Sequence, residues 1–366
     1  MSKILYLAPF DCTGYGRASI DYYKSMVAAG ISVVPKQINL GKPIHDSFVE
    51  RATAQDAQDC DVILTHCIPD YFQYDGYFKK NIGLFAYETN VIPKSWVKRI
   101  KLMDEIWVIN THMKSVLKQY ISGQNIKVVP HAVDLNRFST NFNVGPIGLL
   151  KLRESPFVFY TIGEFVSRKN LEDVLKAYLS EFAPHDNCLL FIKTWKSGVN
   201  SQTVKKEVNN LINYVKTNLK LSRYPNVQVC TDYWSDSEID RLHYEADTYV
   251  SLSHGEAWDL SAMAAIGFNS TPIVSRCTGY LDYITPGNGF TISGQQTVCF
   301  GGLDAMPSLY NGRDTWFQPN IVEAKDIMRK VYSNYRGCRK VRCQGIKTIA
   351  KFGYNEVGKI ILKTLK

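Results

Sequence analysis

The sequence predicts an α/β fold made of two doubly wound, parallel-sheet domains that face a central cleft. Its 366 residues, 45% of them hydrophobic and 21% charged, are enough for a large core and suit two domains. Short apolar runs alternate along the chain with longer amphipathic stretches, which is typical of strands joined by crossover helices. The runs fall into two series, so we expect one sheet in each half of the chain.

The apolar runs give the expected strands in order. The first series covers residues 4–7, 31–34, 62–64, 82–85, 106–109 and 126–129. The second series covers residues 157–160, 189–192, 227–229, 248–251 and 272–275. Because ligands of doubly wound sheets bind beyond the carboxyl ends of the strands, the residues that follow each run are the candidates for function.

The segment between the two series is the best candidate for a linker. Residues 141–156 hold Gly145, Pro146 and Gly148 and show no clear periodicity. We therefore expect an N-terminal domain over residues 1–148 and a C-terminal domain over residues 149–345.

The positive charge of the chain is concentrated at its C-terminal end. The chain carries a net charge of +9, and residues 329–366 hold eleven Lys or Arg against one acid, Glu356, a balance of +10. The rest of the chain is therefore close to neutral. Two interpretations stay open: a solvated helix face, or a surface that contacts a polyanion such as nucleic acid or an anionic membrane.

The cysteines and the lack of long apolar stretches indicate the cellular compartment in which we expect the protein. The nine cysteines are an odd number and form no C-x-x-C pair, so we expect free thiols in a reducing compartment. The first apolar run ends at Pro9 and is too short for a secretory signal. No stretch approaches the roughly 20 apolar residues of a transmembrane helix. We expect a cytoplasmic protein, with attachment to a membrane surface as the alternative.

Two strand ends in the N-terminal half carry candidate residues. Gly14 and Gly16 follow the first strand and would let backbone amides approach an anion, although an ordinary tight turn gives the same pattern. His66 follows the third expected strand, where a structural histidine is the default interpretation.

Two strand ends in the C-terminal half favour anion binding more strongly. Gly163 permits a turn, after which Arg168 and Lys169 reach the start of the next helix and form a cradle suited to a diphosphate, with a solvated Arg-Lys pair as the alternative. Farther along, Gly255 allows a second tight turn that leaves Glu256 at a strand end, in front of the helix that begins near Asp259. The predicted site therefore combines two cations, one carboxylate and two helix N-termini.

Several segments resemble the family 4 nucleotide-sugar glycosyltransferases of the GT-B fold. His254-Gly-Glu-Ala-Trp-Asp-Leu resembles the signature of that family, and residues 163–170 resemble its phosphate-binding turn. Further matches are residues 271–275 with Gly279, 87–96, 106–110, 128–138, 316–319 and 351–354. The resemblance extends from about residue 4 to the last helix and rests on the order of several moderately specific motifs.

The resemblance implies two Rossmann-like domains and a C-terminal helix, within residues 346–366, that crosses back to the N-terminal domain. It also implies a retaining, metal-independent hexosyltransferase with a UDP-sugar as the favoured donor and no cofactor besides that co-substrate. In the implied front-face displacement, the leaving diphosphate takes the acceptor proton while Arg168 and Lys169 stabilise its charge. Glu256 would hold the sugar hydroxyls, and His66 would line the cleft near the sugar.

The resemblance assigns the remaining donor contacts to the strand-end turns. The expected donor-binding residues are Gly14, Gly16, Gly163, Ala257, Trp258, Asp259, Leu260 and Ser261. We expect no metal, because Asp59-Cys-Asp61, the obvious D-x-D sequence, precedes its strand instead of following it. The acceptor stays open between a polyanion such as modified DNA, an anionic lipid and a cell-surface glycan.

Two residues depart from the family pattern. The signature has two acids eight positions apart, and Glu256 matches the first, whereas Ala264 stands where the ribose-binding acid belongs. Glu164 stands where many members have an arginine. A lost carboxylate–hydroxyl bond costs roughly 1.5–3 kcal/mol, so a catalytically inactive sugar-nucleotide-binding module is the alternative function. A dinucleotide oxidoreductase is disfavoured, because Gly14-Tyr-Gly16 lacks the third glycine.

Overall fold

The chain divides into two compact units, which are described separately. The computed structural model describes residues 3–11, 13–40, 46–123, 125–139, 142, 156–301, 309–334 and 339–365, without the side chains of 48, 49 and 339–343. Unit 1 comprises Met1–Arg137 and Ile349–Lys366, and unit 2 comprises Phe138–Thr348. Apart from Phe142 and Pro156, the expected linker over residues 141–156 lies outside the described residues.

Unit 1 is built on a six-stranded parallel sheet with the strand order β2-β1-β3-β4-β5-β6. Its strands are β1 (Ile4–Ala8), β2 (Val33–Gln37), β3 (Val62–His66), β4 (Lys80–Phe85), β5 (Glu105–Val108) and β6 (Asn125–Val128). Every residue of β3 and β5 is buried, which explains their continuous apolar runs. Strand β2 starts two residues later than expected and includes Pro35, which an edge strand tolerates because one side of its backbone needs no partner.

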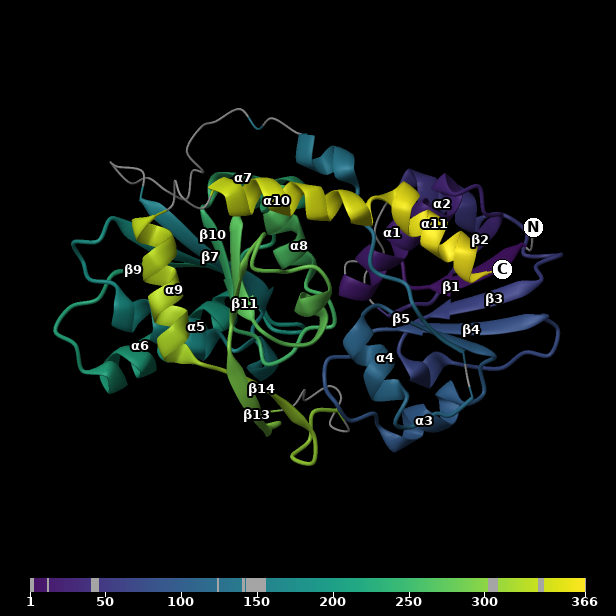
Figure 1. The fold of residues 1–366 in the computed structure, drawn as a ribbon, viewed down its shortest axis with the longest axis horizontal. Coiled ribbons are helices and arrows are strands. Elements are labelled where there is room, and N and C mark those ends of the chain that lie inside the picture. The colour runs from purple at the N-terminus through teal and green to yellow at the C-terminus, as the bar shows by residue number, and fades with distance from the viewer. Residues whose placement is uncertain are drawn as a thin grey trace. The chain divides into compact units, whose positions relative to one another are not determined.

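Helices cover both faces of this sheet. They are α1 (Gly14–Ala28), α2 (Ser47–Thr53), α3 (Lys94–Ile100), α4 (Thr111–Leu117) and α11 (Tyr354–Thr364), with short 3-10 turns at Pro69–Tyr71, Leu135–Ser139 and Ala350–Phe352. Figure 1 shows α1 and α11 on one face and α3 and α4 on the other. This division follows from the strand order. The chain moves from β1 outward to β2 on one side and from β3 outward to β6 on the other, and right-handed crossovers in opposite directions place their helices on opposite faces of the sheet.

The C-terminal helix packs against α1, as the sequence predicted. A Cβ at Gly358 of α11 would overlap the backbone oxygen of Ser25, so only glycine lets the two helices approach this closely. The Tyr354 hydroxyl donates a hydrogen bond of 2.6 Å to Asp21 Oδ1 on α1. Just before α11, Val133 N donates to Phe352 O at 2.9 Å. The last segment of the chain therefore completes unit 1.

Unit 2 contains a second parallel sheet with the order β12-β11-β10-β7-β8-β9. Its strands are β7 (Phe157–Glu164), β8 (Cys188–Trp195), β9 (Asn226–Cys230), β10 (Thr248–Ser251), β11 (Thr271–Ser275) and β12 (Phe290–Ile292). The first five confirm the second series of apolar runs, and β12 was not expected. The order reverses between β7 and β10, so the carboxyl ends of these two neighbouring strands form the switch point where such sheets bind ligands.

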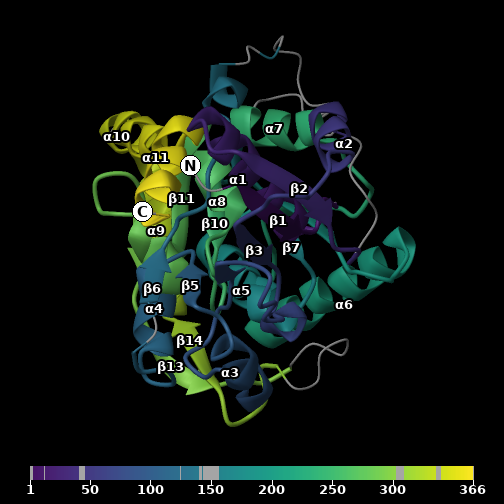
Figure 2. The ribbon, with the colours of Figure 1, turned by 90° about the vertical axis from the view of Figure 1, so that its right-hand side faces the viewer.

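In the part of the chain that the structure describes, six helices and a hairpin surround the unit 2 sheet. The helices are α5 (Leu171–Glu181), α6 (Ser201–Leu219), α7 (Asp236–Glu245), α8 (Leu260–Gly267), α9 (Ile321–Ser333) and α10 (Arg339–Ile349), and Figure 2 shows them from a second direction. Side chains of α5, α6 and α9 form the apolar core on one face of the sheet. Strands β13 (Gly294–Val298) and β14 (Thr315–Pro319) form a separate antiparallel hairpin.

The cysteines and the length of the helices bear on two further expectations. Six cysteines, all buried, have free thiols as predicted: Cys60, Cys67, Cys188, Cys230, Cys277 and Cys299. Cys12, Cys338 and the side chain of Cys343 lie outside the described residues. Across the parts of the chain that the structure describes, no helix is both long and apolar enough to cross a membrane.

Candidate functional site

Three predicted site residues meet at the switch point of unit 2. Lys169 Nζ lies 2.7 Å from Glu256 Oε1, and Arg168 Nη1 lies 3.1 Å from Glu256 Oε2. The glutamate is only 4% exposed, whereas the side chains of Arg168 and Lys169 are 15% and 22% exposed. The turn after β7 and the loop after β10 therefore form one charged cluster, which we call the Glu256 cluster.

Backbone hydrogen bonds join the two segments that carry this cluster. The 3-10 turn η3 (Ser167–Lys169) ends at Asn170, which adopts a left-handed conformation with φ of 51° and caps α5. Asn170 Nδ2 donates to Leu252 O at 2.9 Å. Arg168 O accepts from His254 N at 2.8 Å and from Ser253 Oγ at 2.9 Å. The cations are therefore held at a fixed distance from the loop that presents Glu256.

The backbone of Glu256 is fixed from its other side by the segment after β11. Glu256 N donates to Thr278 Oγ1 at 3.0 Å, and the Thr278 hydroxyl donates back to Glu256 O at 2.7 Å. Gly279 N also donates to Glu256 O at 2.9 Å, and a Cβ at Gly279 would overlap the Ala257 carbonyl. Glycine at position 279 is therefore required by this close approach.

Electrostatics keep Glu256 ionised. Burial would raise the pKa of this carboxyl, but Lys169, Arg168 and a 2.8 Å hydrogen bond from Ser253 Oγ together lower the pKa to about 2. With both cations charged, the cluster carries a net charge of +1. It can therefore attract an anionic ligand while still offering carboxylate oxygens to hydroxyl groups.

Asp259 organises the start of α8. Its backbone is left-handed, with φ of 70°, and its Oδ1 accepts from the amides of Ser261 and Ala262 at 3.1 and 3.2 Å. Its Oδ2 accepts from the hydroxyls of Tyr249 and Tyr280 at 3.0 and 2.7 Å. Burial raises the pKa of Asp259. The amide of Ser261, one of the expected donor-binding residues, is thus bonded to Asp259 in this structure.

The other predicted donor-binding residues of unit 2 lie around this helix start. Trp258 is buried, its Nε1 lies 3.1 Å from Met263 Sδ, and its ring stacks on Tyr283 with centroids 4.9 Å apart. Ala257 is buried, Leu260 is the first residue of α8, and Gly163 lies next to the Lys169 side chain. The buried, stacked rings of Trp258 and Tyr283 therefore support the loop that follows β10.

A histidine that the sequence did not single out connects the site to the hairpin. His254 Nδ1 lies 2.7 Å from Phe317 O, and the imidazole stacks on Trp316 with centroids 4.5 Å apart. At the end of the other hairpin strand, Gly301 adopts φ of +80° beside the Ser167 side chain. The sequence analysis did not predict this contact, because it joins segments about 60 residues apart that share no local periodicity.

Three predicted site residues belong to unit 1. His66 is fully buried, and its Nδ1 lies 2.7 Å from the Tyr6 hydroxyl and 3.2 Å from Ser19 Oγ. Burial lowers the pKa of His66 well below its ordinary value, so the ring is neutral. Gly16 N donates to Thr13 Oγ1 at 3.1 Å, and a Cβ at Gly16 would overlap Asp11, whereas Gly14 has open space around it. Close packing explains the glycine at position 16.

Comparison with known proteins identifies the fold. No protein-family model and no curated protein matches the chain. Among solved structures, HepE of Anabaena in complex with UDP-glucose matches 100% of this chain and 99% of its own, with a TM-score of 0.72 and 13% identity. The chain has the GT-B fold. Sucrose-phosphate synthase of Thermosynechococcus elongatus also matches, with a TM-score of 0.70 and 13% identity over 100% of this chain and 98% of its own. A glycosyltransferase of Rickettsia africae matches with a TM-score of 0.66 and 16% identity over 99% of this chain and 97% of its own.

Within this GT-B chain, a buried alanine of α8 occupies the position where the resembled family has its second acid. Ala264 is 2% exposed, and its carbonyl accepts from Phe268 N at 2.9 Å. At the end of β7, Glu164 Oε1 accepts from Ser197 N at 3.0 Å. Asp61 of the D-x-D sequence precedes β3 and pairs with Lys79 at 2.6 Å. Within the described ranges, no group of three His, Cys, Asp or Glu side chains is placed to hold a metal ion.

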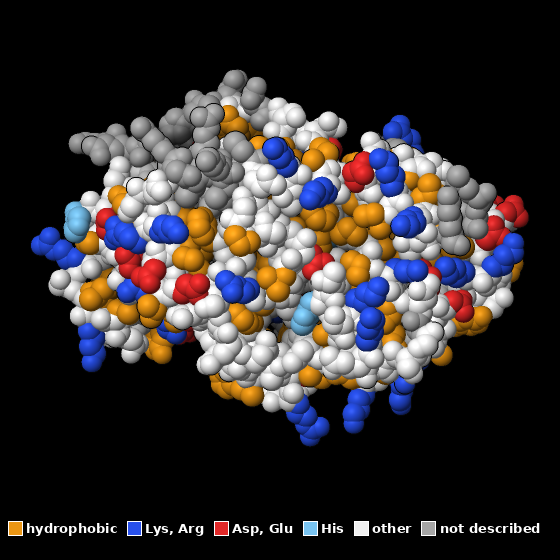
Figure 3. All heavy atoms as spheres, in the orientation of Figure 1, with side chains coloured by type: hydrophobic (Ala, Val, Ile, Leu, Met, Phe, Trp, Pro, Cys, Tyr) orange, Lys and Arg blue, Asp and Glu red, His pale blue; other side chains and the backbone are white. Residues whose placement is uncertain are grey.

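The basic C-terminal segment of the GT-B chain is partly neutralised by acids. Arg329 bonds to Glu181 and Asp186, each at 2.8 Å, and Lys359 pairs with Glu356 at 2.6 Å. Figure 3 shows Lys and Arg side chains spread over the displayed face, with hydrophobic and acidic side chains between them. Two of the eleven cations in this segment, Arg329 and Lys359, are therefore paired with acids.

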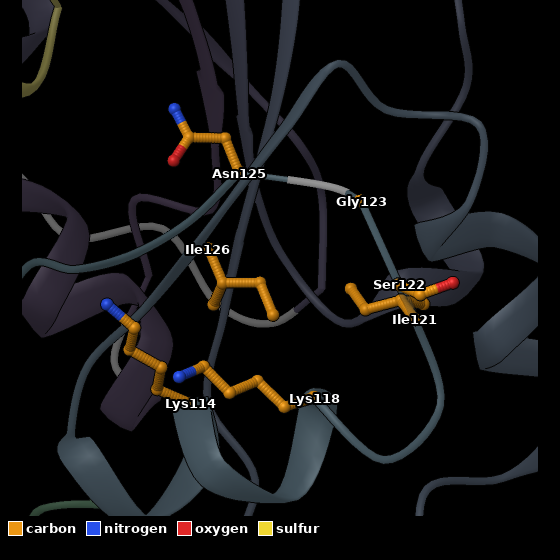
Figure 4. A pocket seen from close by; sticks show the side chains of 7 residues that line it. All are labelled: Lys114, Lys118, Ile121, Ser122, Gly123, Asn125 and Ile126. Atoms are coloured by element: carbon orange, nitrogen blue, oxygen red, sulfur yellow. The ribbon is translucent and has the colours of Figure 1, made fainter.

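Unit 1 of the GT-B chain also contains a hollow of about 500 Å³ at the amino end of β6. It is lined by Lys114, Lys118, Ile121, Ser122, Gly123, Asn125 and Ile126, and Figure 4 shows the two lysines on neighbouring turns of one helical segment. Because it opens at the amino edge of the sheet, it lies away from the edge where doubly wound sheets bind their ligands.

Proposed function

We propose that the chain is a retaining glycosyltransferase that transfers a sugar from a UDP-sugar to an acceptor. The Glu256 cluster carries this proposal: an ionised, buried carboxylate between two cations at the switch point of a Rossmann-like sheet. Solved structures of HepE, which shares the fold, contain UDP-glucose in one case and UDP with glucose in another. A UDP-sugar has the matching groups, because its diphosphate is anionic and its sugar is rich in hydroxyls.

The cluster suits the charge changes of sugar transfer. The bond between the anomeric carbon and the diphosphate oxygen breaks, and negative charge accumulates on the leaving UDP. Arg168 and Lys169 stabilise that charge where it develops, which is the kind of interaction that accelerates a reaction. Glu256 accepts hydrogen bonds from the sugar hydroxyls and orients the ring. The acceptor oxygen attacks from the same face, and its proton goes to the departing phosphate oxygen.

A catalytically inactive sugar-nucleotide-binding module is the second candidate. Ala264 favours it, because an apolar, buried residue stands where the family has its ribose-binding acid. The two candidates differ in turnover: both bind a nucleotide sugar, but only the enzyme consumes it.

We propose a polyanionic acceptor and a cytoplasmic location as extensions of this function. Among the described residues, Lys347, Lys351 and Lys363 of the C-terminal segment form no ion pair. If these lysines contact acceptor phosphates, each neutralised phosphate adds a slope of about −0.9 to the log–log dependence of binding on salt, for duplex DNA. Efficient, salt-insensitive transfer to a neutral saccharide would contradict this extension.

The function is tested directly by incubating the protein with a panel of nucleotide sugars and candidate acceptors, followed by mass spectrometry. We expect release of UDP from one UDP-sugar and a product heavier by one sugar. NMR of the new linkage should show the same anomeric configuration as the donor. Binding of the donor without any consumption, for every acceptor class, would favour the inactive module, and an inverted linkage would contradict the retaining mechanism.

A further inference from the structure

Lys193, near the carboxyl end of β8, is a buried lysine without an acidic partner. The residue is 4% exposed, and no hydrogen bond or ion pair of its Nζ occurs among the described residues. Burial lowers the pKa of this amine. A lysine that is almost entirely buried and has no acidic partner loses hydration without compensation from an ion pair, so its presence at a strand end calls for an explanation.

Two indole rings flank this amine. Lys193 Nζ lies 5.6 Å from the ring centroids of both Trp195 and Trp234. Trp234 is held in place by stacking on Phe191, with centroids 5.8 Å apart and planes 19° apart. Trp195 is 44% exposed, so part of its ring is available to a flat ligand. We call these three residues the Lys193 cage.

Two acids, Asp232 and Glu238, act on Lys193 electrostatically, but neither forms an ion pair with its amine. Both are hydrogen-bonded to other groups. Asp232 Oδ1 accepts from Ser201 Oγ at 3.0 Å. Glu238 Oε2 accepts from the amide and hydroxyl of Ser235, both at 2.7 Å, in the capping box of α7. Lys193 Nζ therefore has no protein oxygen as a partner among the described residues and is available to bond to a ligand.

The cage lies one strand away from the Glu256 cluster. Strand β8 pairs with β7, and Trp195 O accepts from Phe165 N at 2.6 Å, two residues before the turn that carries Arg168 and Lys169. Neighbouring strands are about 4.8 Å apart. In a nucleoside diphosphate the base is separated from the diphosphate by one ribose, so a base can reach the cage while its diphosphate contacts the Glu256 cluster.

We propose that the Lys193 cage binds the donor's nucleobase and selects uracil over cytosine. This inference rests on the proposed function. Trp195 and Trp234 provide surfaces on which a base can stack. Lys193 can only donate hydrogen bonds, so it pairs with the O4 carbonyl of uracil and finds no acceptor at the same ring position of cytosine, which carries an amino group.

The test compares UDP, CDP and inorganic pyrophosphate by isothermal titration calorimetry. UDP and CDP share the ribose and diphosphate and differ only at the base, and pyrophosphate reports the cation site alone. We expect the protein to bind UDP about tenfold more tightly than CDP, in line with one hydrogen bond to a charged group. Lys193→Met should weaken UDP binding about tenfold and leave CDP and pyrophosphate binding unchanged, which abolishes the preference.

Two further variants keep the test decisive. Lys193→Gln retains a polar group that both donates and accepts, so it should bind UDP and CDP equally even if the methionine variant folds poorly. Lys196→Met, at a lysine that pairs with Glu207 on the surface at 3.5 Å, is the matched control and should behave as wild type. Thermal unfolding checks that each variant is folded.

The outcomes separate the inference from the function on which it rests. Unchanged UDP binding in both Lys193 variants would overturn the base-binding role. Parallel loss of UDP, CDP and pyrophosphate binding would also overturn it, because Lys193 would then act on phosphate. If the unmodified protein binds pyrophosphate but no nucleotide, the inference fails together with the proposed donor. Binding of UDP with no preference over CDP leaves the donor proposal intact and refutes the selection by Lys193.

Discussion

Lys169 Nζ lies 2.7 Å from Glu256 Oε1, and this contact joins the turn after β7 to the loop after β10. The carboxylate thus pairs with the cations that we propose bind the donor's diphosphate. A bound diphosphate must share Lys169 and Arg168 with Glu256, so the carboxylate affects both the sugar and the strength of nucleotide binding.

Replacing Glu256 by Gln should have opposite effects on catalysis and on nucleotide binding. Loss of the carboxylate removes the proposed sugar contact, so we expect turnover to fall about 100-fold or more, the range seen when a group that stabilises a transition state is removed. UDP should bind several-fold more tightly, because its diphosphate no longer competes with an internal anion. Steady-state kinetics and calorimetry measure the two effects.

The control for this variant is Glu172→Gln, which removes a carboxylate that pairs with Lys176 at 2.7 Å on the exposed side of α5. It should leave both turnover and UDP affinity unchanged. Near-normal turnover of the Glu256→Gln protein would exclude Glu256 as the sugar-binding acid.

The contact between α1 and α11 should make stability depend on pH. Burial raises the pKa of Asp21 to about 6, although its bond to Tyr354 and the nearby Lys24 and Arg137 oppose the shift. Because the folded pKa lies above the unfolded value of about 3.8, Asp21 contributes most to stability below pH 4, and this contribution is lost as the pH rises through 6. Asp21→Asn should therefore be more stable than wild type at pH 8, by roughly 1–2 kcal/mol after solvent screening.

Urea unfolding of both proteins at pH 4 and pH 8 measures this difference. Tyr354→Phe is the control, because it removes the hydrogen bond without removing the ionisable group and should lower stability at both pH values. An Asn variant that is equally destabilised at pH 4 and pH 8 would show that Asp21 is ionised in the folded protein throughout this range.

Introducing the missing family acid at position 264 should destabilise the protein. Ala264 is 2% exposed within α8, so a glutamate there forces a methylene group and a carboxylate into a buried position. We expect Ala264→Glu to lower the free energy of unfolding by about 2 kcal/mol or more. Chemical denaturation measures this loss, with Val322→Glu, at a 65% exposed position of α9, as a tolerated control. Unchanged stability together with tighter UDP binding would show that position 264 faces the ribose.

Transfer should continue in the presence of excess chelator. Arg168 and Lys169 supply two positive charges at the proposed diphosphate position, which is the electrostatic role that a divalent cation has in other phosphate sites. The measurement is the initial rate with and without EDTA, after removal of bound metal. A rate that falls in EDTA and recovers on addition of Mg²⁺ or Mn²⁺ would show that these cations are not sufficient.

The sheets and the strand-end chemistry could be predicted from the sequence, because both depend on short segments. The runs at 157–160 and 248–251 are apolar since β7 and β10 are buried, and a turn with two cations and a loop with one acid follow them directly. Doubly wound topology then requires neighbouring strand ends to meet. The contact between Lys169 and Glu256 follows from that rule, although its 2.7 Å length does not.

The parts that escaped prediction depend on contacts between distant segments. His254 stacks on Trp316, and Asp259 accepts hydrogen bonds from Tyr249 and Tyr280, yet none of these pairs shares a periodic pattern. The left-handed backbone of Asp259 was equally hidden, since its φ of 70° is maintained by the tyrosine bonds and the helix cap and not by a glycine. These contacts decide which amides remain for a phosphate, so the details of donor binding needed the structure.

The role of the Glu256 cluster in donor binding is tested most directly by the affinity of UDP for Lys169→Gln, measured by calorimetry beside wild type. Lys176→Gln, at an exposed lysine of α5 paired with Glu172, serves as the matched control. We expect micromolar-range or tighter binding to wild type and to the control, and at least tenfold weaker binding to Lys169→Gln, because one charge-assisted bond to the diphosphate is lost. UDP binding to a folded Lys169→Gln protein with the affinity of wild type would contradict the claim that the Glu256 cluster holds the donor.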